Sequence, residues 1–155
     1  RELLYTKKSL KVISPKIEGY VGFENTSFMG DVLQAHDATS FSTVLLASLD
    51  DLDLSESKRM ILFHLTDIKN TNMKFRSSTK RVLEDWGELP HLIKKGSVEI
   101  KLKTEHRDLS IWSLDMTGKR IHKIETIYQN GIYHFDCDTV PENSHPTMAY
   151  EITAD

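Results

Sequence analysis

Short segments in which apolar and polar residues alternate run through this chain, and they predict strands rather than helices. The clearest is "GSVEIKLKT" (96–104), in which Val98, Ile100 and Leu102 fall on one face and charged side chains on the other. Such alternation is typical of an antiparallel strand with one buried and one hydrated face. Weaker alternation or a short apolar run predicts further strands at 9–14, 18–23, 42–49, 59–66, 109–115, 120–127 and 147–153.

Turn residues separate these segments and predict how they are connected. In "SLDDLDLSESKRMILFHLTD" (48–67), Asp and Ser lie between two apolar runs. Their side chains accept hydrogen bonds from nearby backbone N–H groups, which favours a turn. This stretch is therefore interpreted as a hairpin whose connection is a turn or one short helical turn rich in Asp and Ser. The Asn130–Gly131 pair tolerates positive φ and predicts a second, tighter hairpin.

Roughly nine or ten short strands at spacings near ten residues predict an all-β chain. The expected fold is an antiparallel β-sandwich of jelly-roll type. Residues 1–155 are about the length of one ordinary domain. The chain opens at Arg1 directly into strand-like sequence without a signal peptide, so it is interpreted as part of a longer multidomain chain.

Composition narrows the classes of partner. Hydrophobic residues make up 39% and charged residues 28%, which is normal for a globular domain. The net charge is −3 with Lys and Arg scattered along the sequence, which argues against nucleic-acid binding. Membrane spanning is not expected, because every apolar run is shorter than the roughly 18 residues it requires. The single cysteine, Cys137, excludes an internal disulfide and lies in a strand pattern that faces inward.

The stretch 67–95 is the longest one without regular alternation, and it includes a candidate helical turn at "STKRVLEDW". A loop of this length is usually functional or packed across an open end of the fold. Trp86 with Asp85 and Glu88 has the combination that sugar recognition needs, an aromatic plane beside polar groups. The simpler interpretation of Trp86 is a plug at the end of the sandwich. Tyr133 and His134 are the second candidates for sugar contact, and Trp112 is expected in the core.

Metal and catalytic sites find less support. His134, Asp136 and Asp138 would share one face of a strand and could offer ligands to a divalent ion, but a hydrated sheet face is the favoured interpretation. "DDLDLSE" lacks the glycine and terminal glutamate of a calcium loop, so a hydrated turn is favoured, and the sequence does not place a structural Ca²⁺ elsewhere. The chain has no G-x-S-x-G motif and no carboxylate pair in an apolar setting. No cofactor, metal ligand or catalytic residue is therefore expected, and the chain is not expected to be an enzyme.

Several phrases, in order, resemble one family. "YTKKSLKVISPKIEGYVGF" is similar to the segment that follows the catalytic barrel in large bacterial glycoside hydrolases. "TVLLASLDDLDLSESKRMILFHLTDIKNTNM", "WGELPHLIKKGSVEIKL", "LDMTGKR" and "AYEI" resemble later motifs of the same family. The chain differs from that pattern at four positions, where the family has Gly, Gly, Glu and an aromatic residue: Asp51, Asn72, Lys95 and Ala149.

The resemblance implies a C-terminal ancillary β-sandwich domain of a barrel glycosidase, like a carbohydrate-binding module and without catalytic carboxylates. The expected function is a non-catalytic accessory module of a carbohydrate-active enzyme that binds polysaccharide or oligosaccharide weakly. The alternative is a structural domain that packs on the catalytic domain of the same chain without binding sugar. A third hypothesis is an independent hydrolase or metal-dependent enzyme. For an accessory module, an extracellular or cell-surface location in a bacterium is expected.

Overall fold

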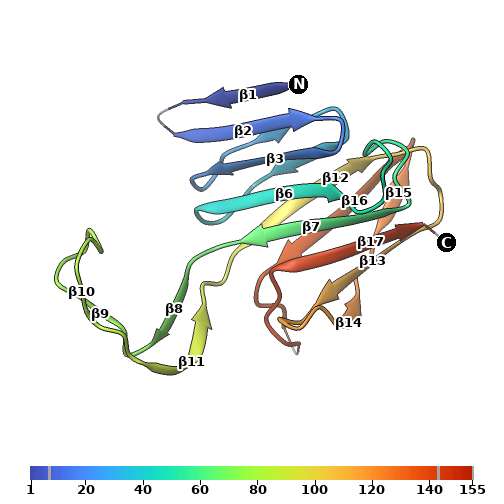
Figure 1. The fold of residues 1–155 in the computed structure, drawn as a ribbon. Helices are drawn as coiled ribbons and strands as arrows, with labels where there is room; N and C mark the ends of the chain where they lie inside the picture. Colours follow the sequence, from blue (N-terminus) through green and yellow to red (C-terminus); the bar gives the residue numbers. More distant parts are fainter. Residues whose placement is uncertain (7, 143, 155) are drawn as a thin grey trace.

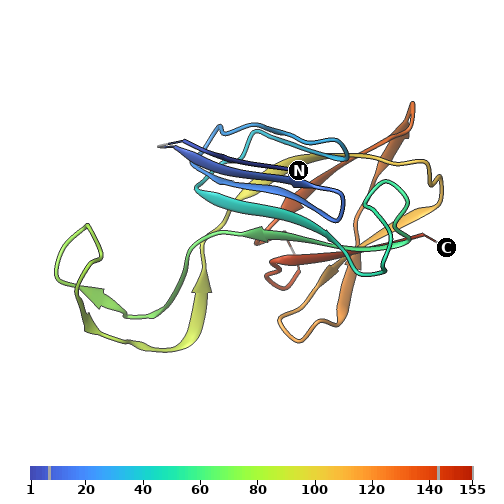
Figure 2. The same cartoon turned by 45° about the horizontal axis from the view of Figure 1, so that its top comes forward.

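The computed structural model describes residues 1–6, 8–142 and 144–154, and within these ranges the chain forms seventeen strands and no helix. Two antiparallel sheets face each other, and a two-stranded arm projects from one end (Figures 1 and 2). The expected all-β antiparallel sandwich is confirmed. The number of strands exceeds nine or ten because the arm and several expected loops contain short paired strands.

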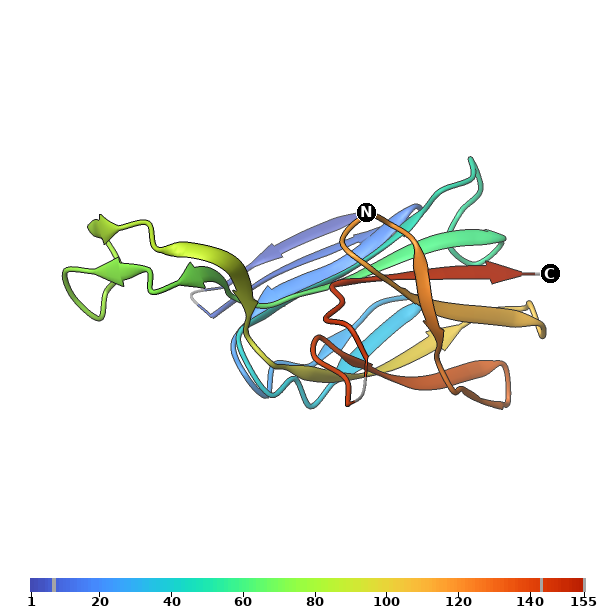
Figure 3. The same ribbon diagram turned by 90° about the horizontal axis from the view of Figure 1, so that it is seen from below.

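The larger sheet is antiparallel throughout and forms the upper layer in Figure 3. The hairpin expected from the stretch 48–67 lies at the centre of this sheet. Its two strands pair with Val44 opposite His64 and Leu46 opposite Leu62. The strands of the sheet, in spatial order, are β1 (Glu2–Tyr5), β2 (Ser9–Ser14), β3 (Ile17–Gly22), β6 (Ser42–Ser48), β7 (Arg59–Leu65), β17 (Ala149–Ala154), β13 (Leu109–Leu114) and β14 (Arg120–Lys123).

The smaller sheet covers only part of the larger one. The expected turn at Asn130–Gly131 joins two of its strands, with φ of 53° and 82° at these residues. The chain passes repeatedly between the sheets, as in a jelly roll. The strands, in spatial order, are β15 (Ile127–Gln129), β16 (Ile132–Asp138), β12 (Ser97–Lys103), β5 (Leu33–His36) and β4 (Phe28–Met29).

The hydrophobic core lies between the two sheets and consists of the inward-facing residues of both. Val98, Ile100 and Leu102 all belong to it, so the alternation of residues 96–104 is confirmed. Cys137 is fully buried, and burial raises the pKa of its thiol well above the usual range. Other core residues come from both layers: Tyr20, Leu33, Ala35, Val44, Leu46, Met60, Leu62, Ile111, Phe135, Tyr150 and Ile152.

Trp112 does not lie in this core, so the prediction for it is wrong. On β13, Ile111 faces inward and Trp112 faces outward, because successive side chains point to opposite faces of a sheet. The Arg120 guanidinium lies 5.4 Å and the Lys123 ammonium 5.8 Å from the centre of the indole ring. Both cations are attracted electrostatically to the electron-rich face of the ring.

The connection between β6 and β7 is organised by the carboxylate of Asp50. It accepts hydrogen bonds from the hydroxyls of Ser57 (2.7 Å) and Ser48 (2.9 Å) and from the backbone N–H of Lys58 (2.8 Å). Burial raises the pKa of Asp50, but these hydrogen bonds outweigh it and bring the pKa to about 2. The acidic stretch thus forms a hydrogen-bonded turn, and Leu54 within it is buried in the core.

Glu18 links the two sheets at the open end of the sandwich. It lies on β3 of the larger sheet and is 1% exposed. Its carboxylate accepts backbone hydrogen bonds from Asp31 (2.9 Å) and Val32 (3.0 Å), in the turn before β5, and from Leu33 (2.7 Å), the first residue of β5 in the smaller sheet. A Cβ atom on Gly30 would overlap this carboxylate, so glycine is needed there for space.

We predict that Glu18→Gln lowers the free energy of unfolding by about 3 kcal/mol. The amide of Gln brings two N–H donors to a site where every protein partner is also a donor, so a buried N–H group is left without an acceptor. Urea unfolding of the two proteins measures the difference. Glu99→Gln is the matched control, because Glu99 is exposed on β12. Equal unfolding midpoints for Glu18→Gln and the control would contradict the prediction.

His64 is a second buried polar group. It is fully buried on β7, where Nδ1 donates to the carbonyl of Cys137 (3.0 Å) and Nε2 lies 3.2 Å from the hydroxyl of Ser42. Burial lowers the pKa of His64 to about 4, although the hydrogen bond to Cys137 acts in the opposite direction. The imidazole is therefore neutral in the folded protein at neutral pH.

We predict that His64 makes the protein less stable in mild acid. Its folded pKa of about 4 lies below the unfolded value of 6.5, so the unfolded chain takes up the proton first as the pH falls. Stability is complete above pH 6.5 and declines by about 3 kcal/mol towards pH 4. Urea unfolding across this range measures the decline. It should disappear in His64→Gln and persist in His91→Gln, where the histidine is exposed on the arm; equal slopes in all three proteins would refute it.

Candidate functional site

The stretch 67–95 forms a protruding two-stranded arm, so the expected irregular loop with a helical turn is wrong. β8 (Ile68–Thr71) pairs with β11 (Glu88–Ile93), and β9 (Lys74–Phe75) pairs with β10 (Leu83–Asp85). In Figures 1 and 3 the arm extends away from both layers. Its strands show no clear alternation because most of their residues are exposed and neither face covers a core.

Trp86 lies on this arm between β10 and β11, and 72% of its surface is exposed. It therefore does not plug the end of the sandwich. Its carbonyl accepts a hydrogen bond from the Asn70 side chain (2.8 Å), and Gly87 after it has φ of 69°. Asn72, in the turn between β8 and β9, also has positive φ (60°). The backbone at Trp86 is thus fixed while the ring is free.

Asp85 and Glu88 flank Trp86, and each uses one carboxylate oxygen to hold the arm together. Asp85 Oδ1 accepts a hydrogen bond from the N–H of Gly87 (2.9 Å), and Glu88 Oε1 accepts one from the Asn72 amide (2.9 Å). Both residues are exposed. An exposed aromatic residue and two exposed carboxylates held by hydrogen bonds thus lie within four consecutive residues of the arm.

Tyr133 and His134 lie in the smaller sheet, away from Trp86 (Figure 1). Tyr133 is 2% exposed, and its hydroxyl accepts a hydrogen bond from the N–H of Leu109 (3.1 Å). Its buried ring has no face free for a sugar. His134 is half-buried on the opposite face of β16, together with Asp136 and Asp138, as the alternation predicts. The five candidate residues therefore lie in two separate places.

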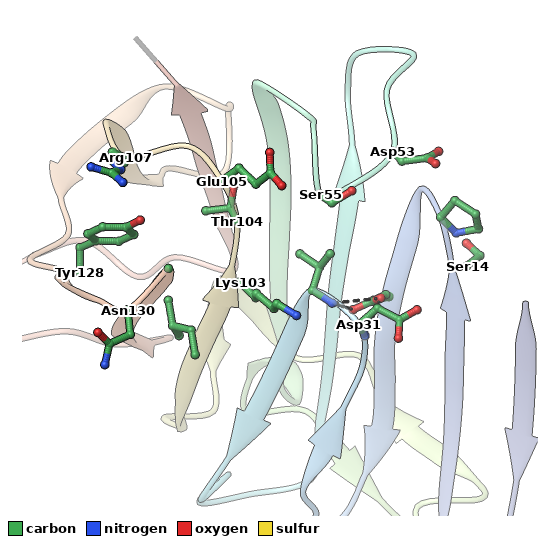
Figure 4. A pocket seen from close by; sticks show the side chains of 15 residues that line it. Ser14, Asp31, Asp53, Ser55, Lys103, Thr104, Glu105, Arg107, Tyr128 and Asn130 are labelled. Atoms are coloured by element: carbon green, nitrogen blue, oxygen red, sulfur yellow. Dashed lines mark hydrogen bonds between the residues drawn. The ribbon is translucent and has the colours of Figure 1, made fainter.

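A groove with a volume of about 1060 Å³ lies at the open end of the sandwich (Figure 4). Tyr128 and Asp53 lie on opposite sides of it, with Lys103 and Asp31 between them (Figure 4). Glu18 is in its lining, so the link between the sheets also shapes the groove.

Hydrogen bonds between distant segments fix the walls of the groove. The backbone N–H groups of Lys103, Thr104 and Leu54 donate to the carbonyls of Val32 (2.9 Å), Gly131 (3.1 Å) and Pro15 (2.7 Å), respectively. The ring nitrogen Nε2 of His106 lies 3.0 Å from the carbonyl of Glu56 and joins the segment after β12 to the β6–β7 connection. The groove is therefore preformed, as small-molecule sites usually are.

No sequence pattern predicts this groove. Its lining comes from five segments that are far apart in the chain, and each of them has the sequence of an ordinary turn or strand end. The acidic turn after β6 supplies Asp53 and Ser55, and the Asn130–Gly131 hairpin brings Tyr128 to the rim. Each turn was predictable from its own residues, but the position of these turns side by side at one end of the sandwich depends on the tertiary fold.

The described residues contain no group of three or more His, Cys, Asp or Glu side chains placed to hold a metal ion. Within the same residues, no helix has the length and apolar character of a membrane span. No protein-family model, no curated protein and no solved structure matches this chain.

We predict that Gly87→Ala disrupts the arm but leaves the sandwich intact. A Cβ atom at this position would overlap the carbonyl oxygen of Thr71 and lie 2.6 Å from the N–H nitrogen of Met73, and φ is positive. Hydrogen–deuterium exchange should show faster exchange at residues 68–93, with the melting temperature of the sandwich changed by less than about 2 °C.

Gly118→Ala is the control for this variant. Gly118 also has positive φ (86°), but a Cβ atom there meets nothing within 4 Å. It lies in the β13–β14 turn, so its substitution should leave exchange in the arm unchanged. Unchanged exchange in the arm of Gly87→Ala would contradict the prediction.

Proposed function

We propose that this chain is a non-catalytic accessory module of a carbohydrate-active enzyme and that it binds polysaccharide weakly. The observation that carries the proposal is the exposure of Trp86, at 72%, on a backbone fixed by Asn70 and Gly87. An exposed aromatic ring on a fixed backbone offers a flat apolar surface to a ligand at little cost in conformational entropy. The flat ring suits the apolar C–H face of a sugar, and the free oxygens of Asp85 and Glu88 suit its hydroxyl groups.

Binding at Trp86 is expected to be weak because the ring lies on a projecting arm and not in a pocket. One stacked ring contributes about 1 kcal/mol, and an exposed ligand gains little from desolvation. A polysaccharide compensates by offering many equivalent sugar units. This fits a module that keeps an enzyme near its substrate, and it agrees with the resemblance to a glycoside hydrolase accessory domain and with an extracellular or cell-surface location.

The alternative function is structural: the arm packs on the catalytic barrel of a glycoside hydrolase, and the module binds no sugar. Several exposed apolar side chains of the arm favour it, namely Ile68 (45%), Val82 (43%), Leu89 (72%) and Leu92 (52%). Residues 67–95 hold seven Lys and Arg against four Asp and Glu, a net charge of +3 in a chain of net charge −3. The partner surface in this case is an acidic face of the barrel with apolar hollows.

The two functions make different predictions for Trp86→Ala and Leu89→Ala. If Trp86 stacks on sugar, Trp86→Ala weakens the affinity measured by affinity electrophoresis through polysaccharide gels by about fivefold. The melting temperature should change by less than about 2 °C, because the ring is exposed. Leu89→Ala removes an equally exposed apolar side chain from the same arm and should leave retention unchanged.

The docking alternative predicts no retention of the unmodified protein on any polysaccharide. Retention that both variants lose equally would show that the apolar arm, and not aromatic stacking, holds the ligand. A Trp86→Ala protein that fails to fold would contradict the exposed position from which the proposal starts.

A further inference from the structure

We infer that the groove at the open end of the sandwich is a second carbohydrate site, selective for neutral oligosaccharides. This inference rests on the proposed function, which makes a glycan the ligand, and it adds a binding place and a ligand class. The groove is separate from Trp86: it lies between the two sheets at the end opposite the arm (Figures 1 and 4).

Tyr128 supplies the aromatic surface of this site. Its ring centre lies 4.7 Å from that of Tyr133, with 44° between the ring planes, and Tyr133 is itself fixed by its hydrogen bond to Leu109. Tyr128 remains 39% exposed at the rim of the groove. A ring that is supported by a buried neighbour loses little conformational freedom on binding, which favours stacking on a sugar.

Hydrogen-bonding groups of both kinds line the groove. Carboxylates of Asp31, Asp53 and Glu105 can accept hydrogen bonds from sugar hydroxyls, while Lys103 and Arg107 can donate to hydroxyl and ring oxygens. These five side chains are exposed, so the ligand can reach them. A sugar hydroxyl both donates and accepts, and a mixed lining of this kind therefore matches it better than a lining of one charge sign.

The charge balance of the groove decides which sugars fit. The formal net charge of the lining is −2. Four acidic residues and two basic residues contribute to it: Glu18, Asp31, Asp53 and Glu105, and Lys103 and Arg107. Anionic ligands such as uronic acid chains are repelled by this excess of carboxylates. The volume, about 1060 Å³, lies at the upper end for small-molecule sites and accommodates more than one sugar ring.

The experiment is NMR titration of the ¹⁵N-labelled protein with neutral hexasaccharides of glucose, xylose, mannose and galactose, and with an oligogalacturonate of equal length. A neutral oligosaccharide should shift the amide signals of residues 103–107 and 128–132. The oligogalacturonate should shift them at least tenfold less at equal concentration. Tyr128→Ala should weaken the neutral ligand about tenfold.

Two controls separate this site from Trp86. Tyr5→Ala removes a tyrosine that is 79% exposed on β1, outside the groove, and should leave the titration unchanged. Trp86→Ala should likewise leave the groove signals responsive. A second groove variant, Asp53→Ala, should weaken the neutral ligand without changing the melting temperature, since Asp53 is exposed.

Three results would overturn the inference. Shifts confined to residues 70–91 that vanish in Trp86→Ala would refute the groove but leave the proposed function standing. Equal shifts with the oligogalacturonate would refute selectivity for neutral sugars. An absence of shifts with every oligosaccharide at millimolar concentration, together with no retention on polysaccharide, would overturn both the groove and the proposed function.

Discussion

The buried carboxylate of Glu18 is the interaction on which the open end of this sandwich depends. A charge removed from water is costly unless it is fully hydrogen-bonded, and here three successive backbone N–H groups of the opposite sheet satisfy it. The link fixes the distance between β3 and the turn before β5. It also explains why residue 30 is glycine, since a side chain there would displace the carboxylate.

The same link gives the groove its shape. Val32, one of the donors to Glu18, also accepts a hydrogen bond from Lys103, so the carboxylate is connected through the turn to the end of β12. The groove thus consists of strand ends and turns fixed by backbone hydrogen bonds, on which exposed polar side chains are displayed. Many β-sandwiches present their binding sites in this way, on loops that a rigid framework of strands holds in position.

The arm is built on a different principle. An isolated two-stranded ribbon is only marginally stable, and this one is held by bonds from side chains to backbone, such as Asn70 to Trp86 and Thr71 to Pro90. It contributes no residue to the core. Its conformation is therefore local, and its exposed apolar side chains are available to a partner. The molecule combines a groove coupled to its core with an arm largely independent of it.

The elements that could be predicted from the sequence are those whose signals are local. The strand at residues 96–104 and the turn at Asn130–Gly131 were both predictable. A half-buried strand requires alternating apolar and polar residues, and a turn with positive φ favours Asn and Gly, so each signal lies within a few consecutive residues. The outward position of Trp112, the exposure of Trp86 and the meeting of Asp53, Lys103 and Tyr128 were decided only by the tertiary structure. Which face of a strand is buried, and which turns become neighbours, depends on the pairing of distant segments, and no short stretch of sequence encodes that pairing.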